Sequence, residues 1–229
     1  MVKFGYLPAI TPMNFEQARF NMVEQQIRTW EVLDPMVLDL LMRLHREDYV
    51  PRQYHALAFA DMEIPLGHGE KMLSPKMEAR LLQELALKPG DSILEVCTGS
   101  GFMTALLANL GGHVYSVEIV AEFTQDAGAR LAGHGIANVT LETGDAARGW
   151  DRHAPYDAIV LTGSVPVLPD AFLKSLRPGG RLIAVVGEPP VMEARLITCV
   201  AAGAYDTVGL FETCIAPLRN ALQPERFVF

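Results

Sequence analysis

Short apolar runs alternate with amphipathic segments through the middle of the chain. The apolar runs have the length of buried strands and lie at 92–96, 113–118, 139–142, 157–161 and 181–186. The segments with helical periodicity lie at 101–110, 120–131 and 169–176. Short strands that alternate with helices of about ten residues are typical of a parallel sheet covered on both faces. The pattern therefore predicts a doubly wound, mostly parallel α/β fold.

Helical periodicity also precedes this core. Residues 14–43 predict two short helices, and the second begins at Asp34-Pro35, a capping side chain followed by proline at the first helical position. Residues 58–75 hold two glycines and two prolines with few periodic cues, so we predict a loop there. Ser74-Pro75 is a further start signal, and a helix should follow as far as Leu85.

The C-terminal part predicts strands without intervening helices. Residues 194–200 and 207–215 have strand character, which indicates that the sheet ends in an antiparallel region. Residues 223–229 suggest one more packed strand. We expect a single domain with an N-terminal arm over 1–12, helices and a loop over 13–75, a core over 76–187, and strands over 188–229.

Composition limits the possible partners. The 229 residues carry 19 Lys+Arg against 27 Asp+Glu, a formal charge of −8, which disfavours nucleic acid and anionic membrane surfaces as partners. No apolar run approaches the roughly 18 residues that span a bilayer. Cys97, Cys199 and Cys214 share no metal-ligand spacing and are odd in number, so we expect no metal site and a reducing, cytoplasmic location. The oligomeric state is left open.

Candidate chemistry follows the predicted strands, because ligands of open α/β sheets bind at the carboxyl ends of the strands. The first strand leads into Cys97-Thr98-Gly99-Ser100-Gly101, a turn whose backbone N–H groups can approach a ligand closely. The second strand ends at Glu118, which can accept hydrogen bonds from ribose hydroxyls. The third ends at Gly144-Asp145, a possible acceptor for an adenine amino group. Each signal alone also fits an ordinary turn or helix start.

Together these signals discriminate between cofactors. A dinucleotide pyrophosphate requires G-x-G-x-x-G, whereas Thr104 stands three residues after Gly101, so NAD is disfavoured. Acids that close the first two strands, Glu95 and Glu118, followed by Gly-Asp after the third, resemble the motifs of class I S-adenosylmethionine-dependent methyltransferases. The resemblance implies a Rossmann-like fold, S-adenosylmethionine as the cofactor and S-adenosylhomocysteine as the product.

A closer resemblance covers residues 23–187. The segments VEQQIRTWEVLDPMVLDLLMRLHREDYVP, FADMEIPLGHGEKMLSP, LEVCTGSGFMTALLA, HVYSVEIV, TGDAARGW, APYDAIVLTGSVP and LRPGGRLIAVVG are similar, in order and spacing, to the protein-L-isoaspartate O-methyltransferase family. The resemblance implies a set of cofactor-binding residues, namely Glu95, Thr98, Gly99, Ser100, Gly101, Glu118, Gly144 and Asp145.

Two positions depart from the pattern of that family. Cys97 replaces a usual glycine, which the turn can accommodate if the residue keeps a negative φ. The substrate loop of the family usually reads G-x-G-Q-T-I-S-x-P, and this chain has other residues at most of its positions. They are Gly67, His68, Gly69, Glu70, Lys71, Met72, Leu73, Ser74 and Pro75.

The usual serine is therefore Leu73, and we consider Ser74 and Lys71 as candidate catalytic residues. Ser74 is also a typical helix N-cap, Lys71 is also explained as an exposed loop cation, and His68 either contacts substrate or packs. The resemblance implies methyl transfer to L-isoaspartyl residues of damaged proteins, with a protein or peptide carboxylate as the acceptor. The alternatives are another protein carboxylate, a small molecule, or a non-catalytic relative that still binds S-adenosylmethionine.

Overall fold

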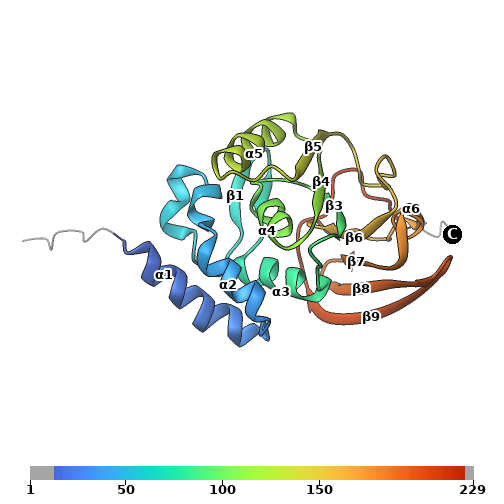
Figure 1. The fold of residues 1–229 in the computed structure, drawn as a ribbon, viewed down its shortest axis with the longest axis horizontal. Helices are drawn as coiled ribbons and strands as arrows, with labels where there is room; N and C mark the ends of the chain where they lie inside the picture. Colours follow the sequence, from blue (N-terminus) through green and yellow to red (C-terminus); the bar gives the residue numbers. More distant parts are fainter. Residues whose placement is uncertain (1–12, 225–229) are drawn as a thin grey trace, which may run out of the picture.

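A seven-stranded sheet forms the centre of the computed structural model, which describes residues 13–224 (Figure 1). Its order is β5-β4-β3-β6-β7-β8-β9. The strands are β3 (Ser92–Val96), β4 (His113–Glu118), β5 (Val139–Thr143), β6 (Tyr156–Leu161), β7 (Leu176–Glu188), β8 (Val191–Ala201) and β9 (Ala204–Thr213). Strands β3 to β7 pair in parallel and β8 and β9 in antiparallel, which confirms the predicted fold class.

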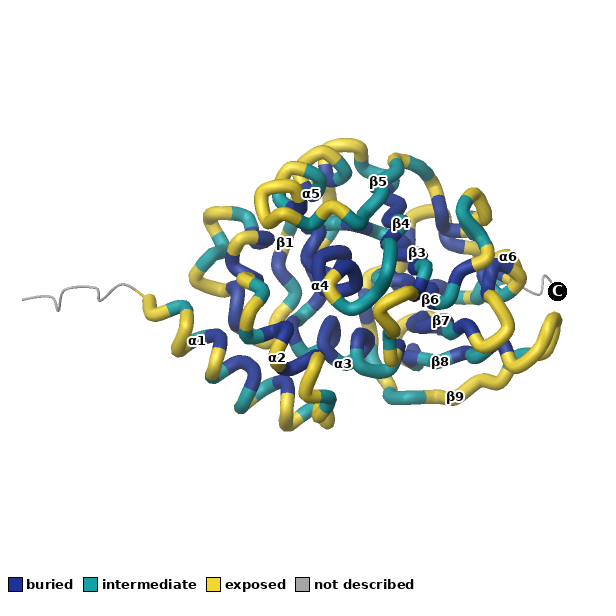
Figure 2. The backbone as a smooth tube through the Cα atoms, in the orientation of Figure 1, coloured by how far each residue is buried: buried dark blue, intermediate teal, exposed yellow. Residues whose placement is uncertain are grey.

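Successive side chains of β3 point to opposite faces of the sheet, and each face is covered by a buried layer. Ile93 faces the layer that contains α3 (Pro75–Leu85), α4 (Phe102–Leu110) and α5 (Ala121–Gly133). Leu94 and Val96 face the layer with α6 (Asp170–Lys174) and the C-terminal segment. Because both faces are covered, β3 and β4 are buried along most of their length, including the polar residues Glu95, Ser116 and Glu118 (Figure 2).

The N-terminal helices form an outer layer over α3 and α4 (Figure 1). They are α1 (Phe15–Met22), which continues through a π turn and a 3₁₀ turn to Trp30, and α2 (Pro35–Arg43). The Asp34 side chain accepts hydrogen bonds from the N–H groups of Met36 at 2.7 Å and Val37 at 3.4 Å, so the predicted cap is confirmed. Two short 3₁₀ helices, Arg46–Tyr49 and Arg52–Leu57, complete this layer.

The segment predicted as a loop over 58–75 contains a hairpin, and that prediction was wrong. Strands β1 (Ile64–Gly67) and β2 (Glu70–Met72) pair in antiparallel. His68 and Gly69 form the connection, and together with Gly67 at the end of β1 they have positive φ values of 53°, 82° and 105°. Gly-x-Gly between two short extended runs is a hairpin signal. The strands are too short to be stable alone, and buried Ile64 and Met72 attach them to the core.

Most predicted boundaries are confirmed within a few residues. Strand β7 begins at Leu176, five residues before the predicted start. Ser74 occupies the N-cap position of α3, but its side chain makes no capping hydrogen bond. The predicted strand over 223–229 is not formed at 223–224, and its remainder, like the arm over 1–12, lies outside the described residues. Between residues 13 and 224, no helix is both long and apolar enough to cross a membrane.

Candidate active site

The main cavity opens at the carboxyl ends of β3 and β4, beside the β1–β2 hairpin. Strand β3 lies between β4 and β6, and the helices that follow β3 and β4 lie on the same face of the sheet. The cavity contains about 790 Å³ of space, including its open mouth. Apolar side chains of Leu66, Met103, Ile119 and Phe123 line it together with polar groups of the first strand-to-helix loop. This is the edge at which open α/β sheets bind ligands.

The first loop brings three of the predicted cofactor-binding residues, Thr98, Gly99 and Ser100, to the wall of this cavity, and their contact with a cofactor stays a prediction. Gly101 follows with a φ of 85° at the N-cap of α4 and does not line the cavity. A Cβ atom there would lie 3.0 Å from the Cβ of Ala127, so glycine lets α4 and α5 approach each other. The role of Gly101 is therefore to shape the loop.

Glu118 is the acid that faces the cavity. One carboxylate oxygen accepts a hydrogen bond from the N–H of Gly99 at 2.9 Å, and the other accepts from the N–H of Val120 at 2.9 Å. A carboxylate has about four acceptor positions, so lone pairs remain for a ligand hydroxyl. Glu118 thus orients the first loop and presents acceptors to the cavity.

Glu95, the other predicted acid, lies beneath the loop and does not line the cavity. Its side chain is fully buried and accepts a hydrogen bond from the Thr104 hydroxyl at 2.5 Å, while Oε1 has no partner. Burial raises the pKa of Glu95 to about 8, so the carboxyl group is mostly protonated at neutral pH. Its direct contact with a cofactor stays a prediction.

Gly144 and Asp145 line a smaller cavity that shares Cys97, Ile119, Leu218 and Arg219 with the main one. Asp145 accepts hydrogen bonds from the N–H of Ala147 at 3.0 Å and from the side-chain amide of Asn220 at 2.8 Å. The predicted acceptor is therefore next to the main cavity, and one of its oxygens is engaged by the C-terminal segment.

The hairpin forms one side of the main cavity and contacts α5 at its turn. The His68 ring contacts the Glu122 carboxylate and lies edge-on to the Phe123 ring, with 5.4 Å between the ring centroids. Neither His68 nor the flanking Gly67 and Gly69 lines the cavity. His68 thus links the turn of the hairpin to α5, and Gly67 and Gly69 are exposed beside it.

The second half of the predicted substrate loop lies at the cavity. Met72 and Leu73 are buried and line it, and so does Lys71, whose ammonium group lies 3.1 Å from a Glu63 carboxylate oxygen. Ser74 instead lines a second cavity on the other side of Leu73. The structure therefore brings Lys71, but not Ser74, to the predicted site of methyl transfer.

Cys97 has a φ of 76°, so the negative φ expected from the sequence was wrong. The left-handed region is unfavourable for residues with a Cβ, which explains why glycine is usual there in the family that the sequence resembles. Burial is the main cause that raises the pKa of the Cys97 thiol, and nearby Glu118 and Glu70 add to it. The thiol is therefore protonated at neutral pH and is a poor nucleophile.

The donor set of the cavity fits S-adenosylmethionine. Glu118 offers acceptors suited to ribose hydroxyls, and Leu66, Ile119 and Phe123 provide apolar surface suited to an adenine ring. The backbone N–H groups of the first loop suit the carboxylate of an amino-acid moiety. These are the chemical groups of S-adenosylmethionine.

Comparison with known proteins agrees with the geometry. A family model described as protein-L-isoaspartate(D-aspartate) O-methyltransferase matches residues 17–203. The chain belongs to this methyltransferase family. The protein-L-isoaspartate O-methyltransferase 1 of Rhodopseudomonas palustris is 39% identical over 174 residues, which are 76% of this chain and 71% of the relative. The enzyme of that name from Anaeromyxobacter dehalogenans is 40% identical over 191 residues, 82% of this chain and 91% of the relative.

Two solved structures share the fold of this family member. A protein-L-isoaspartate O-methyltransferase structure matches with a TM-score of 0.75 at 22% identity, over 87% of this chain and 65% of that one. A Plasmodium falciparum structure named for the same activity, solved with S-adenosyl-L-homocysteine, matches with a TM-score of 0.72 at 20% identity, over 90% of this chain and 98% of that one. The resemblance stated from the sequence is confirmed.

Sequence reasoning missed several residues at the site of this methyltransferase. Glu78 of α3 lines the cavity in an ion pair with buried Arg46, which also donates to the carbonyl oxygen of Leu73 at 2.6 Å. Thr162 and Arg219 line the cavity from the end of β6 and from the C-terminal segment. No local motif marks Arg46, Glu78 or Arg219, because their partners lie at least 12 residues away in the chain.

Proposed function

We propose that this protein transfers a methyl group from S-adenosylmethionine to the free carboxylate of L-isoaspartyl residues in damaged proteins. The observation that carries the proposal is that a cofactor-sized cavity and the substrate-loop hairpin lie next to each other. A cavity suited to S-adenosylmethionine lies at the carboxyl ends of β3 and β4, and the hairpin at the substrate-loop position of the family forms one of its walls. The relatives from Rhodopseudomonas palustris and Anaeromyxobacter dehalogenans are named for this activity.

The chemistry requires orientation more than proton transfer. S-adenosylmethionine supplies an electrophilic methyl group on a sulfonium when bound. A carboxylate acceptor has a pKa near 4 and is already ionised at neutral pH, so no general base is needed. The acceptor oxygen forms the new O–CH₃ bond as the S–CH₃ bond breaks, and the electron pair of that bond stays on sulfur. The protein has to hold the acceptor in line and to exclude water.

Individual residues then have distinct roles. Glu118, held by the N–H of Gly99, would accept the ribose hydroxyls, and the N–H groups of Thr98 and Ser100 would face the amino-acid part of the cofactor. Asp145 would lie near the adenine edge, and Glu95 and Gly101 would support the loop from behind. Buried Met72 and Leu73 would keep water away from the transferred methyl group.

A second candidate function is methyl transfer to a different acceptor, either another protein carboxylate or a small molecule. The observation that favours it is the hydrophobic wall at the substrate-loop position. Leu73 replaces the usual serine and is buried, and the hydroxyl of Ser74 lies at a separate cavity. The donor usually placed beside the methyl group is therefore missing from the hairpin.

The test uses a pair of peptides that differ only in the linkage of one residue. The protein is incubated with labelled S-adenosylmethionine and either an L-isoaspartyl peptide or its normal aspartyl twin, and base-labile methyl esters are counted. We expect labelling of the isoaspartyl peptide alone. Cofactor binding without isoaspartyl-dependent labelling would support the second candidate, provided that another acceptor in a cell extract is labelled. Binding without any turnover would indicate a non-catalytic relative.

We also propose a cytoplasmic location. Cys97, Cys199 and Cys214 are all free thiols in the structure, which suits a reducing compartment. Fractionation of cells with an antibody against the chain checks this proposal, and recovery in an oxidising compartment would contradict it.

A further inference from the structure

The C-terminal segment after β9 returns across the carboxyl edge of the sheet and lines the main cavity at residues 216–219. Its backbone is attached to the loop after β6, since the N–H of Ser164 donates to the carbonyl of Ala216 at 2.9 Å and the N–H of Leu218 donates to the carbonyl of Ser164 at 2.8 Å. Leu218 is buried against the core. These contacts fix the backbone position of the next residue, Arg219.

Two hydrogen bonds hold the Arg219 guanidinium against the hairpin. Its Nε donates to a Glu70 carboxylate oxygen at 2.6 Å, and its Nη2 donates to the carbonyl oxygen of His68 at 2.5 Å. A guanidinium has five N–H donors, so three remain after these contacts. The side chain is 42% exposed and lines the cavity. Arg219 is thus oriented and still able to bind a further planar anion.

The charges around the cavity make such a cation necessary for an anionic acceptor. Four acids line the cavity, namely Glu63, Glu70, Glu78 and Glu118. Within residues 13–224, two basic side chains line it, Lys71 and Arg219. The formal charge of the whole chain is −8, so a carboxylate approaches against the mean field of the protein.

Of the two cations, Arg219 is better placed for this role. Lys71 is 52% exposed and is paired with Glu63. Arg219 contacts Glu70 on the cavity side, and its planar fork suits a carboxylate better than an ammonium group does.

We propose that Arg219 binds the acceptor carboxylate of the peptide substrate, and that Glu70 orients the guanidinium while partly neutralising its charge. The fork of Arg219 donates to the carboxylate, and a lone pair of one oxygen remains free to attack the methyl group. The C-terminal segment, outside the predicted cofactor motifs, thereby contributes to acceptor recognition. This inference rests on the proposed function, because it takes the acceptor to be a carboxylate.

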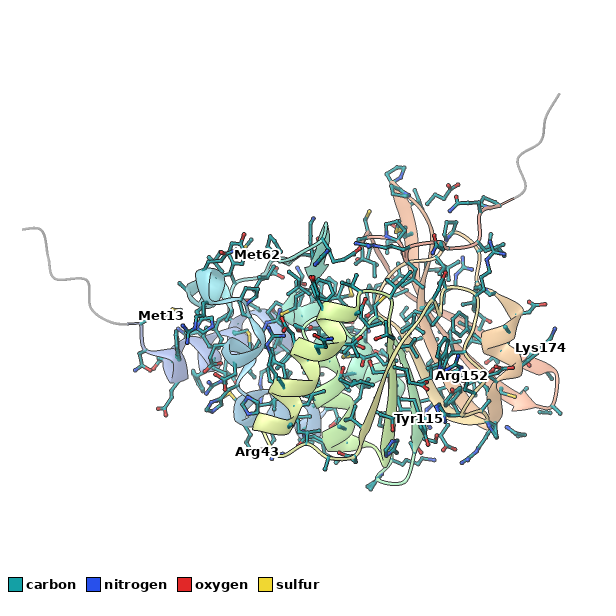
Figure 3. The ribbon with its side chains drawn as sticks, turned by 90° about the horizontal axis from the view of Figure 1, so that it is seen from above. Met13, Arg43, Met62, Tyr115, Arg152 and Lys174 are labelled. Carbon is teal, nitrogen blue, oxygen red and sulfur yellow. The ribbon has the colours of Figure 1, made fainter. Side chains whose placement is uncertain are left out.

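The experiment measures binding of two peptides to the protein loaded with S-adenosylhomocysteine. One peptide carries the isoaspartyl residue, and the other carries the α-carboxamide analogue, which lacks the negative charge. The variants are Arg219→Gln, Arg219→Lys and Glu70→Gln. Arg43→Gln is the matched control, because Arg43 is also an exposed arginine paired with an acid. Arg43 lies at the end of α2, far from the hairpin. Figure 3 shows it on the opposite side of the N-terminal layer from Met62, which precedes the hairpin.

We expect Arg219→Gln to raise the Kd of the isoaspartyl peptide by about 10- to 100-fold, because a hydrogen bond between charged partners is lost. The Kd values of the carboxamide peptide and of S-adenosylhomocysteine should change less than about twofold. Arg219→Lys should give an intermediate loss. Glu70→Gln should leave the isoaspartyl peptide bound at least as tightly, since Arg219 then has no competing charge. Arg43→Gln should match the wild type.

Other outcomes overturn the inference. Equal weakening of both peptides by Arg219→Gln means that Arg219 only holds the hairpin, and weaker S-adenosylhomocysteine binding means that it serves the cofactor. Equal affinity of the wild type for the two peptides also contradicts it. Failure of the proposed function looks different, because the wild type then transfers no methyl group to the isoaspartyl peptide. A wild type that methylates this peptide, together with an unaffected Arg219→Gln variant, rejects the inference alone.

Discussion

Two glutamates at the ends of neighbouring strands show how surroundings decide the chemistry of a side chain. Glu118 faces the cavity, and two backbone N–H groups donate to its carboxylate. Glu95 is sealed beneath the first loop with Thr104 as its hydrogen-bond donor, and burial raises its pKa to about 8. The first is suited to bind hydroxyl groups, and the second is a mostly neutral part of the core.

Glu95→Gln should make stability less dependent on pH. The pKa of Glu95 is about 8 in the folded state and 4.5 ordinarily, so the Glu95 carboxyl group keeps its proton to a higher pH in the folded state than in the unfolded chain. The free energy of unfolding of the wild type therefore falls as pH rises from about 4.5 to about 8. Glutamine does not titrate. The free energy of unfolding of the variant should therefore rise by about 2–5 kcal/mol relative to that of the wild type over this pH range.

Urea unfolding at pH 5 and pH 8 checks the Glu95 prediction. Glu188→Gln serves as the control, since Glu188 is exposed at the end of β7 and should show no such gain. The same difference between Glu95→Gln and wild type at both pH values would contradict the assigned pKa.

Cys97 should react slowly with thiol reagents although it lies at the cavity. Its thiol stays protonated because burial raises its pKa, and thiolate is the reactive form. Cys214 is exposed and provides an internal comparison. With iodoacetamide at pH 8, Cys214 should be labelled about tenfold faster or more, as measured by mass spectrometry of peptides. Labelling in denaturant should remove the difference, and faster labelling of Cys97 in the folded protein would show an activated thiol.

At the scale of elements, the β1–β2 hairpin depends on contacts from three directions. Arg46 holds the carbonyl oxygen of Leu73, the Glu122 carboxylate contacts the His68 ring, and Arg219 reaches Glu70. A hairpin with strands of four and three residues is marginal by itself. Its place beside the cavity is therefore a property of the tertiary structure.

Arg46→Met should destabilise the protein strongly. Desolvation lowers the pKa of Arg46 and raises that of Glu78 to about 7, while the ion pair between them opposes both shifts. Removal of Arg46 leaves the buried Glu78 carboxylate unpaired and frees the carbonyl oxygens of Ala58 and Leu73. We expect a loss of about 3–5 kcal/mol in the free energy of unfolding, measured by urea titration.

Arg43→Met is the control for the Arg46 prediction. Arg43 pairs with Asp39 on the exposed face of α2, and such surface pairs contribute about 0–1 kcal/mol. Similar losses in both variants would show that the buried pair has no special role in positioning the hairpin.

At the scale of the whole molecule, one sheet with an outer helical layer encloses the cavity. The cavity walls come from the first loop, the end of β6, the hairpin, α3 and the C-terminal segment, which are distant in sequence. A ligand in this cavity contacts several elements at once, so its binding should stabilise the entire fold.

S-adenosylhomocysteine should therefore raise the free energy of unfolding by about 2.7 kcal/mol when its concentration is 100 times the Kd.

Glu118→Ala should weaken the binding of S-adenosylhomocysteine by about 1–3 kcal/mol, because ribose acceptors and the contact with Gly99 are lost. Thermal unfolding and calorimetric titration measure both effects, with NAD as a control that should give no shift. An unchanged Kd in Glu118→Ala would contradict the assigned ribose site.

The parallel core and the loops at its strand ends could be predicted from the sequence, because each depends on local signals. Strand runs such as 92–96, the cap at Asp34, and glycines and acids at strand ends depend on a few adjacent residues. The order and spacing of these motifs also indicated the family, which the comparisons confirmed. Features of this kind could therefore be predicted, whereas the β1–β2 hairpin was missed because its strands are short and depend on contacts with the core.

Packing between elements that are distant in sequence sets which side chains meet at the site. It separated Ser74 from the cavity, sealed Glu95 beneath the loop and gave Cys97 a positive φ. It also brought Arg219 to Glu70, which lies 149 residues away along the chain. Burial and long-range pairing depend on how elements pack, and no local pattern contains that information.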